Sequence, residues 1–134
     1  MKYLGIDYGT KRIGVAFSDD DGRIAFPHGV IAAGPNALSE VAALAKEKNV
    51  GGIVIGESRN FSNEPNALMQ DIEQFSKDIG ELTGLPVAYE QEFFTSAQAA
   101  RQGRDKRGEG ESPATLDASA AALILQGYLD KHRM

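Results

Sequence analysis

Acidic residues stand at three places where the fold is expected to change direction, and their types suit metal-assisted hydrolysis. Asp7 ends the strand-like segment KYLGID before a glycine turn, Glu90 and Glu92 end LPVAYEQE, and Asp117 lies on a late helical segment among alanines. Carboxylates that converge repel one another unless a cation lies between them. Carboxylate oxygens favour Mg²⁺ or Mn²⁺, which can hold a phosphodiester and activate water. The three places together therefore indicate a site for phosphodiester hydrolysis.

Each acid also has a simpler structural explanation. Asp-x-Gly is a common turn composition, so Asp7 would then merely begin a turn. Glutamates such as Glu90 and Glu92 are common at solvent-facing strand ends. Asp117 would be a helix-start carboxylate favoured by the helix dipole, although it falls past the first turn if Ser112 is the N-cap. The combination of the three places favours a shared site over three separate explanations.

The elements that must position these acids are predicted from hydrophobic periodicity and turn residues. Strands are expected at 2–7, 12–18, 24–31, 51–56 and 85–92. Helices are expected at 36–49, from 65 to about 84, and at 113–131. Pro27 pushes the third strand toward a sheet edge or a bulge. The wholly apolar GGIVIG is typical of a parallel strand buried on both faces.

The order βββαβαβα predicts an α/β fold with a five-stranded mixed sheet flanked by helices, in which three antiparallel strands are followed by two parallel strands. Asp7 shares a strand face with Gly5, and the facing residues Gly14 and Ala16 are equally small, which predicts space above the sheet. The segments show no internal repeat or linker, so residues 1–134 are expected to form a single domain.

The amino-acid composition excludes several kinds of functional site. The chain has 134 residues, 42% of them hydrophobic, no cysteine and only two histidines, which excludes thiolate metal sites and disfavours a histidine-rich zinc site. The N-terminus has no signal-peptide pattern and no apolar run is long enough to span a membrane, so a cytoplasmic protein is expected. The formal net charge of -5 argues against a protein that coats nucleic acid non-specifically.

The chain resembles the YqgF family, also called RuvX, of the ribonuclease-H-like superfamily. The segments GIDYGTKRIGVAFSD and LDASAAALILQGYLD look like the family's strand turn and its last-helix aspartate, and QEFFTSAQA is similar to the family's DERLTT-x-EA. The resemblance covers essentially the whole chain. It implies a ribonuclease-H-like fold and a Mg²⁺- or Mn²⁺-dependent nuclease described as acting on pre-16S rRNA or as like a Holliday junction resolvase.

Residue by residue, the resemblance implies that Asp7, Glu92 and Asp117 are the metal-binding catalytic acids, and it selects Glu92 over Glu90. In this hypothesis Asp7 bridges two metal ions. The chain departs from the family pattern at Gln91 and Phe93, where members usually carry an acid and an arginine. The loop IGESRNFSNEP also differs from the usual VG-x-P-x-N-x-x-G. If Phe93 replaces that arginine, one phosphate contact is either missing or supplied by Arg59 or another basic residue.

Two groups of basic residues are candidates for contacts with a nucleic-acid backbone. Lys11 and Arg12 follow the first turn a few residues after Asp7. A second group lies in or beside the glycine-rich stretch before the last helix, and consists of Arg101, Arg104, Lys106 and Arg107. That stretch is equally well explained as a solvated connection. Aromatic residues do not interleave with the basic ones, so recognition is expected to rest on backbone shape rather than on base stacking.

The expected function is metal-dependent hydrolysis of structured RNA, such as a ribosomal RNA precursor or a ribosomal particle, by a monomer or a weak homodimer. Cleavage of DNA Holliday junctions is an alternative, because the same metal chemistry serves DNA. A non-catalytic nucleic-acid-binding module is another. The opening Asp-x-Gly-Thr also resembles the phosphate hairpin of the actin, Hsp70 and sugar-kinase group, which needs a second such domain.

Overall fold

The computed structural model describes residues 1–57, 67–91 and 113–132. The strands are β1 (Tyr3–Tyr8), β2 (Arg12–Ser18), β3 (Ala25–Ala32), β4 (Gly52–Glu57) and β5 (Val87–Gln91). The helices are α1 (Ala37–Glu47), α2 (Ala67–Thr83) and α4 (Pro113–His132). The predicted order of elements is confirmed across the described residues.

The five strands form one mixed sheet in the order β3-β2-β1-β4-β5. The pairs β1–β2 and β2–β3 are antiparallel, whereas β1–β4 and β4–β5 are parallel. The sheet therefore has the predicted composition of three antiparallel strands followed by two parallel strands. The parallel neighbours β1 and β4 end at the same edge of the sheet, which is where Asp7 lies.

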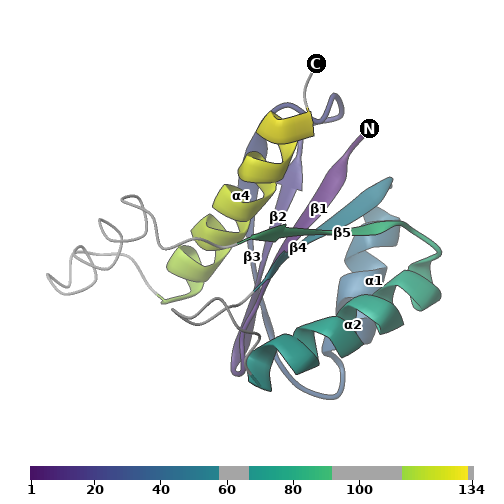
Figure 1. Cartoon of the computed structure of the whole chain (residues 1–134), viewed down its shortest axis with the longest axis vertical. Coiled ribbons are helices and arrows are strands. Elements are labelled where there is room, and N and C mark those ends of the chain that lie inside the picture. Colours follow the sequence, from purple (N-terminus) through teal and green to yellow (C-terminus); the bar gives the residue numbers. More distant parts are fainter. Residues whose placement is uncertain (58–66, 92–112, 133–134) are drawn as a thin grey trace, which may run out of the picture.

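Helices cover both faces of the sheet (Figure 1). The side chains of Leu4, Ile6 and Ile55 pack with residues of α1 and α2 on one face, while Ala16 and Val54 pack under α4 on the other. Both Val54 and Ile55 are fully buried because β4 is covered on its two faces. Such double burial explains why GGIVIG is wholly apolar.

The edge strand β3 carries Pro27, as predicted. Its pairing with β2 shifts register between Val15 and Ala16, opposite Gly29 and Pro27. A proline has no N–H to donate to the ladder, so it is tolerated at an edge or an irregularity. The irregularity interrupts the free edge of the sheet, which disfavours pairing with another strand.

The second helix, α2, ends where the sequence predicts. Gly84 follows it with φ of 72°, a left-handed conformation that favours glycine, and donates to the carbonyl of Gly80 at 2.8 Å. The apolar residues that recur at helical spacing along α2 are buried at Ile72, Phe75 and Ile79, but the last of them, Leu82, is 56% exposed. Periodicity alone therefore does not predict the exposure of Leu82. None of the helices in the described ranges is long and apolar enough to cross a membrane.

Candidate active site at the end of β1

Asp7 is half-buried near the end of β1, on the sheet face that α4 covers. Successive strand residues alternate between faces, so Asp7 shares its face with Tyr3 and Gly5. The antiparallel register pairs Asp7 with Gly14 and Gly5 with Ala16, as the sequence predicts. The carboxylate of Asp7 is thus carried by a central strand whose neighbours on the β2 side are small.

The space above these small residues is filled by α4 at Gly5. A Cβ atom added to Gly5 would lie 2.7 Å from Cβ of Leu125 and 3.1 Å from the carbonyl oxygen of Ala121. Glycine is therefore required here for the helix to approach the strand so closely. The contact fixes α4 directly against β1, two residues before Asp7.

Glu90 is buried rather than solvent-facing, with 8% of its surface exposed. Nζ of Lys131 donates a hydrogen bond of 2.7 Å to its Oε2 atom. A Cβ atom on Gly127 would lie 3.1 Å from the same oxygen, so glycine at this turn of α4 leaves room for the carboxylate. The structural explanation of an exposed glutamate at a strand end is therefore wrong for Glu90.

The roles of Lys131 and Gly127 were not found from the sequence. Both lie on the last turns of α4, far along the chain from Glu90. A lysine near a helix C-terminus is expected for helix-dipole reasons alone, so its type gives no signal of a partner on a strand.

Asp7 and Glu90 lie on the same face of the sheet. The parallel register pairs Ile6 with Ile55 and Gly56 with Glu90. Continued by one residue, it puts Gly56 beside Asp7, so the two acids are two strands apart in one row. At the usual spacing of strands, this corresponds to about 10 Å between their backbones. The intervening residue is a glycine, which leaves the row between them without a side chain.

Tyr8 closes the opposite face of the sheet at the same strand end. Its ring packs against Phe75 of α2, with centroids 5.2 Å apart. Burial of the hydroxyl, reinforced by the negative charge of Asp71, raises the pKa of Tyr8 above its ordinary value. Tyr8 is therefore favoured in its neutral form, on the face of β1 opposite to Asp7.

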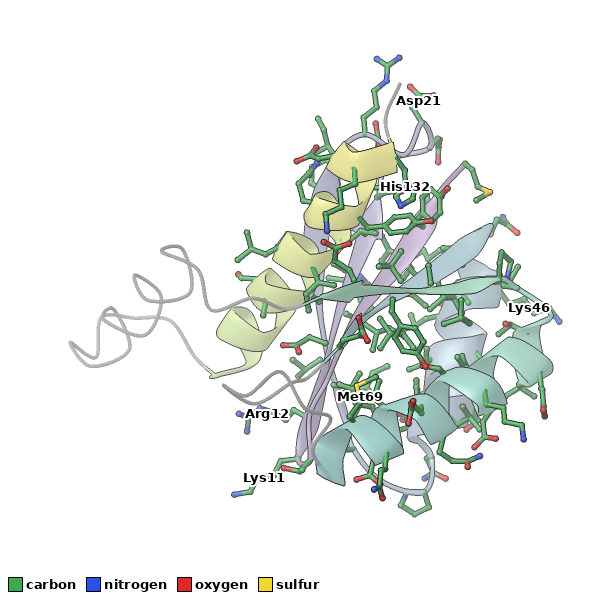
Figure 2. All side chains as sticks on the ribbon, in the orientation of Figure 1. Lys11, Arg12, Asp21, Lys46, Met69 and His132 are labelled. Atoms are coloured by element: carbon green, nitrogen blue, oxygen red, sulfur yellow. The ribbon has the colours of Figure 1, made fainter. Side chains whose placement is uncertain are left out.

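Lys11 lies in the connection from β1 to β2 and Arg12 is the first residue of β2, and both are exposed. The carbonyl of Lys11 accepts a hydrogen bond of 3.0 Å from the amide of Ala33, and Arg12 pairs with Ala32 of β3. Figure 2 shows both side chains at the end of the sheet remote from His132. Their backbones are thus anchored to the sheet, while their cationic ends extend outward near the end of β1.

The other predicted site residues are only partly covered by the described residues. Asp117 lies within α4, but only its backbone is described. Outside the described residues are Glu92, Phe93, and the basic residues Arg101, Arg104, Lys106 and Arg107. Among the residues whose side chains are described, no group of three His, Asp or Glu residues is arranged to hold a metal ion. The complete acidic site therefore remains a prediction.

Comparison with known sequences identifies relatives along the whole chain. A family model, RuvX, described as Holliday junction resolvase, matches residues 1–131. A protein of Oenococcus oeni named "Putative pre-16S rRNA nuclease" is 36% identical over 137 residues, which cover 98% of this chain and 95% of the relative. A protein of the same name from Nitratidesulfovibrio vulgaris is also 36% identical, over 133 residues that cover 97% of this chain and 94% of the relative.

Comparison with solved structures supports the fold. RuvC of Thermus thermophilus superposes with a TM-score of 0.64 and 15% identity, covering 98% of this chain and 95% of that one. The fowlpox virus resolvase, solved with substrate Holliday junction DNA, gives a TM-score of 0.65 and 14% identity, with full coverage of both chains. The expected ribonuclease-H-like fold, with its five-stranded mixed sheet, is confirmed.

Proposed function

We propose, from the membership of this chain in the RuvX family, that it is a metal-dependent nuclease that hydrolyses phosphodiester bonds in structured RNA. A ribosomal RNA precursor is the substrate that the names of its relatives favour. The proposal treats residues 1–134 as one catalytic domain, active in the cytoplasm as a monomer or a weak homodimer. It assigns the catalytic acids as Asp7, Glu92 and Asp117.

The observation that carries the proposal is the register of α4 on β1. The Tyr3 ring meets Tyr128, and two residues later Gly5 meets Leu125 and Ala121, so the helix runs antiparallel to the strand. Two further strand residues advance about 7 Å, equivalent to between four and five helix residues. The same progression then leads from Ala121 to the turn of α4 that carries Asp117. This register supports a shared site for Asp7 and Asp117.

The environment of Glu90 supports Glu92 as the third acid. Lys131 already neutralises Glu90 in a hydrogen bond of 2.7 Å, and a metal would have to displace that ammonium to use the same carboxylate. Glu92 follows Glu90 by two residues, which is the spacing that repeats a strand face. The ion pair anchors β5 at Glu90, two residues before Glu92 in the sequence.

The donor chemistry fits a hard divalent cation. Asp7 supplies carboxylate oxygens on a central strand, and the two other assigned residues are also carboxylates, which suit Mg²⁺ or Mn²⁺. Asp7, Glu92 and Asp117 would hold these ions, which when bound polarise a phosphate and lower the pKa of water. The half-burial of Asp7 limits access of bulk water to its carboxylate, which strengthens its interaction with a bound cation.

Lys11 and Arg12 are assigned to the phosphate backbone. They are exposed beside the end of β1 and carry positive charge on anchored backbones. A lysine or arginine in that position holds a phosphate and reduces the repulsion between the substrate and the acids. The basic residues before α4 would extend these contacts along the strand, and they are Arg101, Arg104, Lys106 and Arg107.

A second candidate function is cleavage of branched DNA. The matching family model is described as Holliday junction resolvase, and the fowlpox virus relative in fold was solved with junction DNA. Junction resolution requires two coordinated cuts and so a symmetric dimer. A non-catalytic binding module is a third candidate, and loss of metal-dependent cutting would favour it.

The test is cleavage of three end-labelled substrates: a precursor rRNA fragment, an unstructured RNA and a four-way DNA junction. Wild type and Asp7→Asn are compared with Mg²⁺, Mn²⁺ or a chelator. Asp78→Asn is the matched control, because Asp78 lies on α2 and accepts a hydrogen bond from Gln74 on the same helix. Metal-dependent cutting of the precursor by wild type and the control, lost in Asp7→Asn, is the expected result.

Preferential cutting of the junction would instead establish the second candidate. If all three proteins bind the nucleic acids but none cuts them with either metal, the nuclease proposal is overturned.

A further inference from the structure

A separate pocket of about 290 Å³ lies at the opposite end of β1 from Asp7. It is formed where the start of β1, the turn between β2 and β3, and the last turns of α4 come together, and its lining includes Tyr3, Asp21, Arg23, Tyr128 and His132. Figure 2 shows His132 and Asp21 together at this end of the molecule, with Lys11 and Arg12 at the other. Asp7, the proposed catalytic residue whose side chain the structure describes, does not line this pocket.

Aromatic rings make up one side of the pocket. Tyr3 meets Tyr128 edge to face, with centroids 5.7 Å apart and an interplanar angle of 62°. The ring of His132 is stacked against that of Tyr128 in a tilted arrangement, with centroids 4.1 Å apart and an interplanar angle of 32°. His132 is exposed, so the stack ends at the solvent. A stack of this kind can be extended by another planar ring.

Positive and negative groups surround these rings. Arg23 is exposed on the turn, and the N-terminal ammonium donates a hydrogen bond of 2.7 Å to the carbonyl of Asp20. Arg23 supplies a charged donor for a phosphate. Asp21, also exposed, supplies a carboxylate that can accept from a ribose hydroxyl or a base amino group.

The turn that carries Arg23 and Asp21 is held in place by hydrogen bonds. Oδ1 of Asp19 accepts from the amides of Arg23 and Ile24 at 2.7 and 3.2 Å, and Nε2 of Gln126 donates to the Arg23 carbonyl at 2.9 Å. Gly22 has φ of 69°, and a Cβ there would lie 2.9 Å from the carbonyl of Met1. The turn is therefore held against the N-terminal residue Met1 and against α4, and the pocket is formed before any ligand arrives.

We propose that this pocket binds an unpaired nucleotide of a single-stranded nucleic acid. The base extends the stack on His132 and Tyr128, Arg23 contacts the phosphate, and Asp21 accepts from the sugar or the base. The volume is near the lower end of the range for small-molecule sites, which suits one nucleotide. The proposal rests on the proposed function for the class of ligand, and it adds a contact away from the acids.

The position of the pocket predicts a role in affinity. Tyr3 and Asp7 share one face of β1 and are four residues, or about 13 Å, apart, with α4 packed on Gly5 between them. A nucleotide in the pocket therefore cannot be the one that is cut. It holds a single-stranded part of the substrate, so its loss should raise KM and leave kcat nearly unchanged.

Binding is tested by NMR on the wild-type protein in chelator, where no cleavage can occur. The chain has two histidines, so the imidazole signals of His132 and His28 report on the pocket and on a control site. His28 lies against Phe17 of β2, with centroids 5.0 Å apart, outside the pocket. The probes are 5′-AMP, 5′-UMP, a short oligoadenylate and inorganic phosphate.

A saturable shift of His132 alone is expected, with a Kd near or below about 1 mM for the mononucleotides and at least about tenfold tighter binding of the oligonucleotide. No shift, or equal shifts of both histidines, would overturn the proposal. If the mononucleotides bind saturably but the oligonucleotide binds no more tightly, the pocket does not hold a nucleotide of a single strand, and that part of the proposal is overturned.

The contacts are identified by measuring how tightly variants bind a labelled oligonucleotide, using fluorescence anisotropy. His132→Ala and Arg23→Gln should each weaken binding about tenfold, whereas His132→Phe should retain it because the ring still stacks. His28→Ala is the matched control and should bind as wild type. Equal affinities of His132→Ala and His28→Ala would contradict the proposal.

The two proposals fail separately. A saturable His132 shift in a protein that cuts no substrate would leave the pocket standing and overturn the nuclease function. If the protein cuts nucleic acid with a metal but His132 shows no shift, the nuclease function stands and the nucleotide pocket is overturned.

Discussion

Lys131 and Glu90 join the last turn of α4 to the end of β5 through a hydrogen bond of 2.7 Å between Nζ and Oε2. The two ends differ in exposure, because 10% of the Glu90 side chain is accessible and 58% of the Lys131 side chain. The strand end therefore depends on a cation that reaches it from the solvent side. The pair connects α4, which carries Asp117, to the strand that ends one residue before Glu92 in the sequence.

Lys131→Met should destabilise the protein by about 1–2 kcal/mol in urea unfolding. The substitution keeps most of the apolar stem but leaves the nearly buried Glu90 carboxylate without its charged donor. The cost is limited because solvent reaches the lysine end. The double variant Lys131→Met with Glu90→Gln should lose less free energy of unfolding than the two single variants lose in sum. A double-mutant cycle measures this difference.

Lys2→Met is the control for this pair. Lys2 lies 3.6 Å from Asp20, whose side chain is 91% exposed. An ion pair whose carboxylate is this exposed contributes little, so a change below about 0.5 kcal/mol is expected. Equal losses for Lys131→Met and Lys2→Met would show that burial of Glu90 has no energetic role.

Gly5→Ala should destabilise the protein by about 1–3 kcal/mol, measured by the same unfolding experiment. The added methyl would lie 2.7 Å from Cβ of Leu125, an atom fixed to the helix backbone, so α4 would have to shift. Gly29→Ala is the matched control on β3, because a Cβ there meets nothing within 4 Å. If both substitutions were equally tolerated, the close approach of α4 to β1 would be refuted.

The order of the elements was predictable because each one has a local signal. The apolar run at β4, the proline on β3 and the glycine after α2 each reflect a constraint on their own segment. The face and partner of Asp7 followed from alternation along β1 and β2. These features depend on neighbours in the sequence or on a hairpin, so a single chain reveals them.

Features that depend on distant residues were not predictable. Glu90 is buried and paired with a lysine on another element, and Leu82 is exposed although it follows the helical spacing of Ile72, Phe75 and Ile79. Likewise, Tyr3 and Tyr128 meet only because β1 and α4 cross. The sequence shows no aromatic residues interleaved with basic ones, yet the fold brings such residues together around one pocket.

Tyr8 should make stability fall at alkaline pH. Its pKa in the folded protein is raised, mainly by burial and secondarily by Asp71, above the ordinary value of 10.0. The unfolded chain therefore loses its phenol proton first, so the stabilisation is present below pH 10 and is lost as pH rises through the folded pKa. Urea unfolding between pH 8 and pH 11 should show a shallower decline for Tyr8→Phe than for wild type.

Tyr128 should contribute to the same decline. Its pKa is raised first by burial, then by Tyr3 and by the carboxylate of Glu90. Tyr128→Phe should therefore also flatten the alkaline decline, and the double variant should flatten it further. An identical pH profile for wild type and the double variant would contradict both assignments.

Lys11→Ala should weaken binding of nucleic acid and make it less dependent on salt. One fewer phosphate contact lowers the slope of log K against log salt by about 0.7–0.9. Binding is measured by anisotropy in the Asp7→Asn background with chelator, so that cleavage does not interfere. Lys46→Ala removes the same charge from α1, away from Lys11 in Figure 2, and should leave the slope unchanged. A slope that changes equally in the two variants would mean that net charge, rather than a contact beside Asp7, determines binding.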